Sequence, residues 1–239
     1  MSLERNSAYY SDRTERFLAT APHQVLGLLA GANPFSLEPR QKDAWQEEIE
    51  ILRLALEGIA GTIYLEFDVP RLGSRIDAAI VSGPAIFSIE FKCGETQYST
   101  ADYNQAWDYA LDLKNFHRAS HNAPIFPILI ATAAPTSEAV WQTPHADGVR
   151  PPRRCNAADL PRVLEEGLST ATGPNLDDEA WGARPIIRRR RSSRQLARCT
   201  RSTRSKPFHA ARPRGRTWRS PRSPSKRSLT ARSLSGGRR

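Results

Sequence analysis

The stretch SRIDAAIVSGPAIFSIEFK, residues 74–92, decides the fold. Its two halves, 74–81 and 85–92, are rich in Ile, Val, Phe and Ala, and Ser82, Gly83 and Pro84 between them form a turn signal. We therefore predict two antiparallel strands joined by a tight turn. If the turn centres on Gly83 and Pro84, the two halves pair along their whole length.

The predicted pairing separates polar from apolar side chains. It places Asp77 opposite Glu90, and Lys92 shares the face of Glu90 because side chains alternate along a strand. A slip of one residue would put the apolar sets on opposite sides, so the agreement supports this register. The other face is predicted to carry Ile76, Ala78, Ile80, Ile89 and Phe91.

Periodicity predicts further elements on both sides of the hairpin. In residues 41–58, Trp45, Ile49, Leu52 and Leu56 recur at helical spacing. The order of elements predicts an α/β fold with a mixed sheet, whose last strand can lie parallel to its neighbour because a long helix precedes it. The other expected elements are a helix over 22–34, a strand over 62–70, a helix over 99–120 capped by Ser99 or Thr100, a buried strand within 123–135, a weak strand near 154–156 and a short helix near 157–167.

Charge divides the chain into two segments. Of the 35 Lys and Arg residues, 20 fall in residues 184–239, which contain no Asp or Glu, so this segment carries +20. Residues 1–183 carry −10, and the total of +10 is therefore no evidence that the folded part binds nucleic acid. We expect a leader with short helices over 1–38, one domain over 39–172 and a disordered Arg- and Ser-rich tail over 173–239.

Several classes of protein are not indicated by the sequence. Cys93, Cys155 and Cys199 form no CxxC pair, which argues against a disulfide scaffold or a zinc site and suits a reducing cytoplasm. There is no GxxxxGK[ST] motif of a P-loop NTPase. No apolar run approaches the ~20 residues of a membrane helix, and the first residues lack the apolar stretch of a secretory signal. We expect a cytoplasmic protein with no membrane partner.

The polar face of the hairpin points to metal chemistry. Two carboxylates on adjacent strands, Asp77 and Glu90, lie ~5 Å apart at Cβ and repel each other unless a cation or a proton intervenes. Mg²⁺ (or Mn²⁺) accepts one or two carboxylates plus water and phosphate oxygens. Lys92 can orient a water or stabilise charge on a phosphate. The alternative is a purely structural role, in which the strand face is solvated and Asp77 and Lys92 form a weak ion pair.

These residues resemble the motif of the PD-(D/E)XK nuclease superfamily, an Asp on one strand and (D/E)xK on the next within a restriction-endonuclease-like αβββαβ core. Gln105 and Tyr109 resemble the QxxxY motif of its RecB-like members. The resemblance implies that Asp77 and Glu90 ligate the metal and that Lys92 acts on the attacking water. It further implies that Gln105 positions that water or Lys92 and that Tyr109 contacts the nucleic-acid backbone.

A carboxylate on the first core helix completes the metal site in many members of the superfamily. Glu48 is the best match, because it borders the Trp45 stripe, and Glu47 is the competitor. A helix-surface charge is the other interpretation of Glu48.

Residues 40–170 resemble more closely the N-terminal nuclease-like domain of bacterial proteins that continue into a helicase-like P-loop domain. The resemblance implies a Mg²⁺-dependent nuclease domain that hydrolyses phosphodiester bonds, in DNA by preference, with a helicase-like NTPase as a partner domain or neighbouring gene product. The alternatives are a catalytically silent nucleic-acid-binding module and a truncated, non-functional fragment. One interpretation of residues 184–239 is an out-of-frame reading of GC-rich DNA.

Other residues carry weaker signals. Arg71 and Arg75 flank Asp77 and could hold phosphate, although surface ion pairs are the more ordinary role. His117 and His121 have the spacing of metal ligands, but without an intervening carboxylate we expect a helix-end surface role. The Arg-rich tail would bind any polyanion through counterion release.

Overall fold

The computed structural model describes residues 7–68 and 75–182 and shows an α/β fold. Its six strands form one mixed sheet in the order β1-β2-β3-β4-β5-β6, which is also their order in the sequence. Neighbours from β1 to β4 are antiparallel, whereas β4, β5 and β6 are parallel. The strands are β1 (Ala8–Arg13), β2 (Thr62–Asp68), β3 (Arg75–Ser82), β4 (Ala85–Lys92), β5 (Ile125–Ala131) and β6 (Arg153–Cys155).

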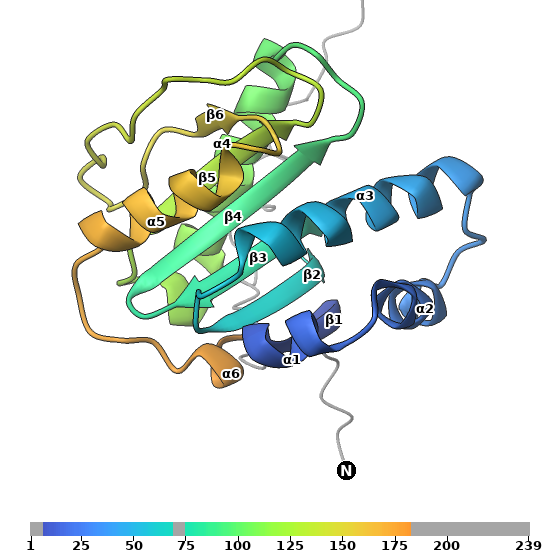
Figure 1. Cartoon of the computed structure of the whole chain (residues 1–239). Helices are drawn as coiled ribbons and strands as arrows, with labels where there is room; N and C mark the ends of the chain where they lie inside the picture. Colours follow the sequence, from blue (N-terminus) through green and yellow to red (C-terminus); the bar gives the residue numbers. More distant parts are fainter. Residues whose placement is uncertain (1–6, 69–74, 183–239) are drawn as a thin grey trace, which may run out of the picture. The chain divides into compact units, whose positions relative to one another are not determined.

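The helices cover both faces of the sheet. Figure 1 shows α3 and α5 in front of the strands and α4 behind them. α4 is the crossover that allows β5 to run parallel to β4, and Ser99 caps it by accepting a hydrogen bond from the Asp102 amide. The helices are α1 (Thr14–Ala19), α2 (Pro22–Ala32), α3 (Pro39–Ala55), α4 (Thr100–Phe116), α5 (Leu160–Thr170) and α6 (Asp178–Trp181), with a 3₁₀ turn at Arg118–Ser120.

The β3–β4 hairpin has the predicted register over its observed pairs, from Ser82 with Ala85 to Ala78 with Ile89. Gly83 has φ of 55°, in the left-handed region where glycine is favoured. A glycine in that conformation followed by Pro84 is typical of a type II′ turn, whose twist matches that of the two strands. The predicted order of helix, three strands, helix and parallel strand is confirmed.

One apolar residue of the hairpin departs from the predicted face. Ala78 and Ile80 pack with the apolar residues of α3, but Ile76 packs on the opposite side with its strand partner Phe67. The change coincides with Glu66 on β2, which has φ of 53° and interrupts the regular pairing between Leu65 and Phe67. The local backbone reversal redirects the side chains there, and strict alternation could not predict it.

An aromatic cluster packs on the α4 side of the sheet, between β2 and the carboxyl-terminal end of α4. Its members are Tyr64, Phe67, His117 and Trp181. The Trp181 ring stacks on Phe67 at 4.6 Å between centroids, and its Nε1 donates to Ser120 Oγ at 3.0 Å. His117 is fully buried, so the predicted surface role is wrong: the ring packs against Phe67 and Trp181, which lie far from it in the sequence.

Two segments at the ends of the domain also differ from the prediction. β1 lies in residues 1–38, where only short helices were expected, and its backbone pairs with β2. The predicted disordered tail begins too early, because α6 lies within 173–182 and buries Trp181 to 1% exposure. Both short elements are held by partners distant in the sequence, and neither has enough periodicity of its own to be recognised.

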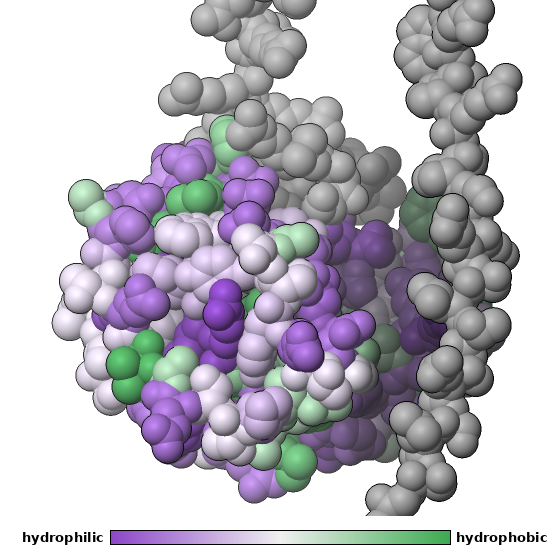
Figure 2. All heavy atoms as spheres, turned by 90° about the horizontal axis from the view of Figure 1, so that it is seen from above, coloured by the Kyte–Doolittle hydropathy of each residue, from purple (hydrophilic) through white to green (hydrophobic). Residues whose placement is uncertain are grey.

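In the described ranges, no helix is both long and apolar enough to cross a membrane. On the coloured part of the face in Figure 2, hydrophobic residues appear singly among polar ones. The exposed large hydrophobic residues Leu28, Phe35, Leu54 and Val140 belong to four separate segments. Scattered apolar residues of this kind are ordinary for a protein surface, so polar residues must carry a functional argument.

Candidate active site

A cluster of carboxylates lies between α3 and the carboxyl-terminal half of β4. We call Glu48, Asp77 and Glu90 the carboxylate cluster. Asp77 Oδ2 accepts a hydrogen bond from the Phe91 amide at 2.8 Å, which fixes the β3 side chain against β4. Glu90 lies on β4 immediately before Phe91 and is buried to 4% exposure. The hairpin therefore brings together the two carboxylates that the sequence predicted to face each other.

Lys92 connects the carboxylate cluster to α4. Its Nζ lies 2.9 Å from Glu90 Oε1 and donates to Gln105 Oε1 at 3.2 Å. Gln105 Nε2 donates in turn to the Tyr109 hydroxyl at 2.8 Å. Gln105 and Tyr109 are one turn apart on α4, so both reach the same side of the helix. The structure thus joins Glu90, Lys92, Gln105 and Tyr109 in one continuous chain of contacts.

α3 supplies the third carboxylate. Glu48 Oε1 lies 3.9 Å from Cys93 Sγ, at the end of β4, whereas Glu47 is exposed. The charges of Glu66 and Glu90 act on Glu48 and help to raise its pKa. Of the two candidates on this helix, Glu48 is therefore the one that faces the cluster.

The protonation of the cluster reflects burial and mutual repulsion. Burial, with the charges of Glu66 and Glu90, raises the pKa of Glu48 to about 8. Burial and the charges of Glu90 and Glu48 raise the pKa of Asp77 well above its usual value. The pKa of Glu90 is also raised by burial, although Lys92 opposes that shift. Near neutral pH the cluster consequently retains protons that a cation would displace.

Lys92 stays charged in these surroundings. Burial lowers its pKa, but contacts with Glu90 and Asp102 outweigh that effect and the pKa is raised. Asp102 Oδ1 lies 3.4 Å from Lys92 Nζ, while the Ser99 hydroxyl and Lys92 lower the pKa of Asp102. The sequence analysis did not select Asp102. Its position three residues after the helix cap Ser99 was the available signal.

Glu66 is a second residue that the sequence analysis missed. Its carboxylate is buried to 7% exposure, accepts a hydrogen bond from Trp45 Nε1 at 2.6 Å, and pairs with Arg75. Arg75 Nη1 also donates to the Tyr9 hydroxyl at 2.6 Å. Arg75 thus forms a half-buried ion pair. An ion pair was the role that the sequence offered as the alternative to phosphate binding. Arg71 lies outside the described residues. No sequence pattern distinguished Glu66 from an ordinary outward-facing strand residue.

The donors of the cluster suit a hard cation in part. Within the described part of the chain, no group of three or more His, Cys, Asp or Glu residues is arranged to hold a metal ion. Mg²⁺, however, needs only one or two carboxylates beside its waters. Glu90 Oε2 is buried and has no hydrogen-bond partner among the described residues, which is costly for a carboxylate oxygen. Asp77 and Glu90 therefore fit a two-carboxylate cation site, with Glu48 next to it.

Comparison with protein-family models, with curated proteins and with solved structures gives no match. Functional inference therefore rests on the residues and geometry of the site itself.

Proposed function

We propose that this chain contains a Mg²⁺-dependent nuclease domain of the PD-(D/E)XK type, with a restriction-endonuclease-like core and DNA as its substrate. The observation that carries the proposal is the chain of contacts from Glu90 through Lys92 and Gln105 to Tyr109, next to two further carboxylates of raised pKa. Acidic side chains gathered in this way repel one another when ionised, and perturbed pKa values cluster at functional sites.

Each residue has a distinct task in this proposal. Asp77 and Glu90 hold the cation, with Glu48 as a neighbouring carboxylate. A bound Mg²⁺ would supply Lewis-acid polarisation of the phosphodiester and a more acidic water. Lys92 places a positive charge within reach of the scissile phosphate and donates hydrogen bonds to the attacking water or to the developing negative charge. Gln105 fixes the Lys92 ammonium, and Tyr109 fixes Gln105.

The test is cleavage of supercoiled plasmid and linear DNA by the purified chain with Mg²⁺ or Mn²⁺ and with EDTA. Asp77→Asn and Lys92→Ala should each lower the cleavage rate by about 100-fold or more, the scale for removing one transition-state donor or charge. Two exposed residues provide matched controls: Asp108→Asn on α4 and Lys42→Ala on α3 should cleave like the wild type. Circular dichroism establishes that all four variants are folded.

Two results would overturn the proposal. One is the absence of metal-dependent cleavage by the folded wild-type protein, and the other is full activity of Asp77→Asn and Lys92→Ala. DNA binding without cleavage, indifferent to metal, would instead support a catalytically silent nucleic-acid-binding module. The helicase-like partner implied by the resemblance stays a prediction, which sequencing of the neighbouring reading frame would test.

A further inference from the structure

A cavity of about 370 Å³ lies next to β6. This volume is within the range of about 300–1,000 Å³ that small-ligand pockets occupy. Its walls come from the segment before α4, from α4 itself, from the loop after β5 and from β6. The lining residues that matter here are Tyr98, Tyr103, Gln142, Pro152 and Arg154.

Arg154 and two tyrosines form the recognition element of the cavity. The Arg154 guanidinium carbon lies 4.7 Å from the centroid of the Tyr103 ring and 5.9 Å from that of Tyr98. Arg154 is exposed, and no carboxylate in the described part of the chain pairs with it. A guanidinium held over rings keeps its edge donors available for an anion, while the parts of the rings that it does not cover are apolar. This combination suits a nucleotide, which has a flat base and an anionic phosphate.

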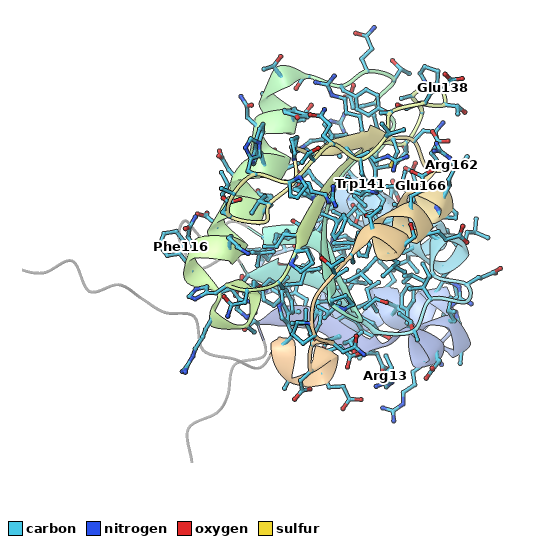
Figure 3. The ribbon with its side chains drawn as sticks, turned by 90° about the vertical axis from the view of Figure 1, so that its left-hand side faces the viewer. Arg13, Phe116, Glu138, Trp141, Arg162 and Glu166 are labelled. Atoms are coloured by element: carbon cyan, nitrogen blue, oxygen red, sulfur yellow. The ribbon has the colours of Figure 1, made fainter. Side chains whose placement is uncertain are left out.

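The walls of the cavity are anchored on both sides. On α4, the Tyr103 ring meets the Trp107 ring edge-on, with centroids 5.8 Å apart. On the loop after β5, Trp141 Nε1 donates to the Val163 carbonyl of α5 at 3.0 Å, and Figure 3 shows Trp141 beside that helix. The cavity therefore belongs to the packed domain and is preorganised, which lowers the entropic cost of binding a ligand.

The cavity adjoins the residues assigned to catalysis. Tyr103 directly follows Asp102, whose Oδ1 lies 3.4 Å from Lys92 Nζ. Arg154 of β6 is in register with Leu129 of β5, which is in register with Glu90 of β4, and neighbouring strands lie about 4.8 Å apart. A nucleotide in the cavity would thus be a near neighbour of a phosphate placed at Lys92.

We propose that this cavity binds an unpaired nucleotide of a single-stranded nucleic acid next to the scissile phosphate, an inference that rests on the proposed nuclease function. The base stacks on Tyr103 and Tyr98, and Arg154 contacts the phosphate. In a duplex each base is already stacked and paired, so an aromatic platform reaches only a base that has left the helix. Phosphate contacts alone would bind single and double strands without this distinction.

The test measures binding separately from cleavage. Fluorescence anisotropy in EDTA gives the affinity of the full chain for a labelled single-stranded oligodeoxynucleotide, for the matched duplex and for the oligoribonucleotide of the same sequence. Tyr103→Ala should weaken single-strand binding by about 5- to 100-fold and leave duplex binding unchanged. Tyr103→Phe, which keeps the ring, should bind like the wild type. The basic tail contributes equally to every variant.

Salt dependence tests the role of Arg154. Arg154→Ala should lower the slope of log affinity against log salt for single strands by about 0.7, the value for one lost phosphate contact. Arg118→Ala, a change at another exposed arginine, should lower this slope by much less than Arg154→Ala. As a check that needs no variant, a 2-aminopurine base in the single strand should change its fluorescence on binding to the wild type, because stacking alters that signal.

The outcomes separate this proposal from the proposed function. If the wild type does not cleave DNA but single-strand binding depends on Tyr103 as described, the subsite stands and the nuclease assignment fails. If the wild type cleaves DNA but Tyr103→Ala affects both substrates equally or neither, or if 2-aminopurine shows no stacking, the subsite is overturned and the nuclease assignment stands. Tighter binding of the oligoribonucleotide would support the subsite and identify RNA as the preferred strand.

Discussion

The carboxylate cluster and the aromatic cluster bury polar groups in different ways. In the aromatic cluster, Trp181 Nε1 donates to Ser120 Oγ, and the Tyr64 hydroxyl donates to the Asp178 carbonyl. These two buried donors have acceptors, as is typical of a structural core. In the carboxylate cluster, acidic groups lie close enough to raise one another's pKa, and Glu90 Oε2 has no hydrogen-bond partner among the described residues. The carboxylate cluster carries an electrostatic cost that folding alone does not require.

This contrast indicates which residues to test for stability and which for function. The aromatic core should respond to substitution through the free energy of unfolding. A cluster of repelling carboxylates should respond through activity and pH dependence, and loss of one of its charges should not destabilise the fold at neutral or alkaline pH. The predictions below separate the two regions by these opposite responses.

The largest expected effect is on stability. Trp181→Ala should lower the free energy of unfolding by about 3–5 kcal/mol, because it removes a fully buried ring that stacks on Phe67 and packs against Tyr64. Urea denaturation measures the change. Phe35→Ala, at a ring that is 74% exposed, should stay within about 0.5 kcal/mol of the wild type. A small effect of Trp181→Ala would show that α6 is not part of the core.

The second effect is on the pH dependence of stability, measured in EDTA. The pKa of Glu48 rises from 4.5 in the reference state to about 8 in the folded protein. Between these values the folded state binds more protons than the unfolded state, so stability falls as pH increases, and the loss is complete above pH 8. Glu48→Gln should therefore be more stable than the wild type at pH 8, by on the order of 2 kcal/mol, and nearly equal to it at pH 4.5.

The neighbouring Glu47 provides the control for this experiment. Glu47→Gln removes the same charge from an exposed position of the same helix and should show no comparable gain at pH 8. Addition of Mg²⁺ at pH 8 should raise the unfolding midpoint of the wild type, because a ligand of the folded state stabilises it by mass action. Equal pH profiles for Glu48→Gln and the wild type would contradict the raised pKa of Glu48.

The smallest effect concerns Tyr109. Tyr109→Phe removes the hydroxyl that accepts a hydrogen bond from Gln105 Nε2 at 2.8 Å. Since a hydrogen bond contributes about 0.5–1.5 kcal/mol, kcat for DNA cleavage should fall by roughly 2- to 10-fold, while KM changes less. A higher KM with unchanged kcat would instead indicate that Tyr109 contacts the nucleic-acid backbone, as the resemblance implies.

Much of this site could be predicted from the sequence because its key residues lie on one hairpin and one helix. The β3–β4 register follows from the separation of an apolar face from a polar one and from the Gly83 turn, and Gln105 and Tyr109 share a helical face by their spacing. Glu66 and Asp102 were not predicted. Their significance depends on contacts with Trp45, Arg75 and Lys92 that no local pattern encodes.

The sequence by itself determined the order of the core elements from α3 to β5, the hairpin register and the split between an acidic body and a basic tail. These properties depend on the alternation of side chains over short stretches and on composition. The tertiary structure decided which charges meet. It placed Glu48 rather than Glu47 at the cluster, reversed the side chains around Glu66, and buried His117 beneath Trp181. Such contacts join residues far apart in the sequence, and the packing of helices on the sheet alone brings them together.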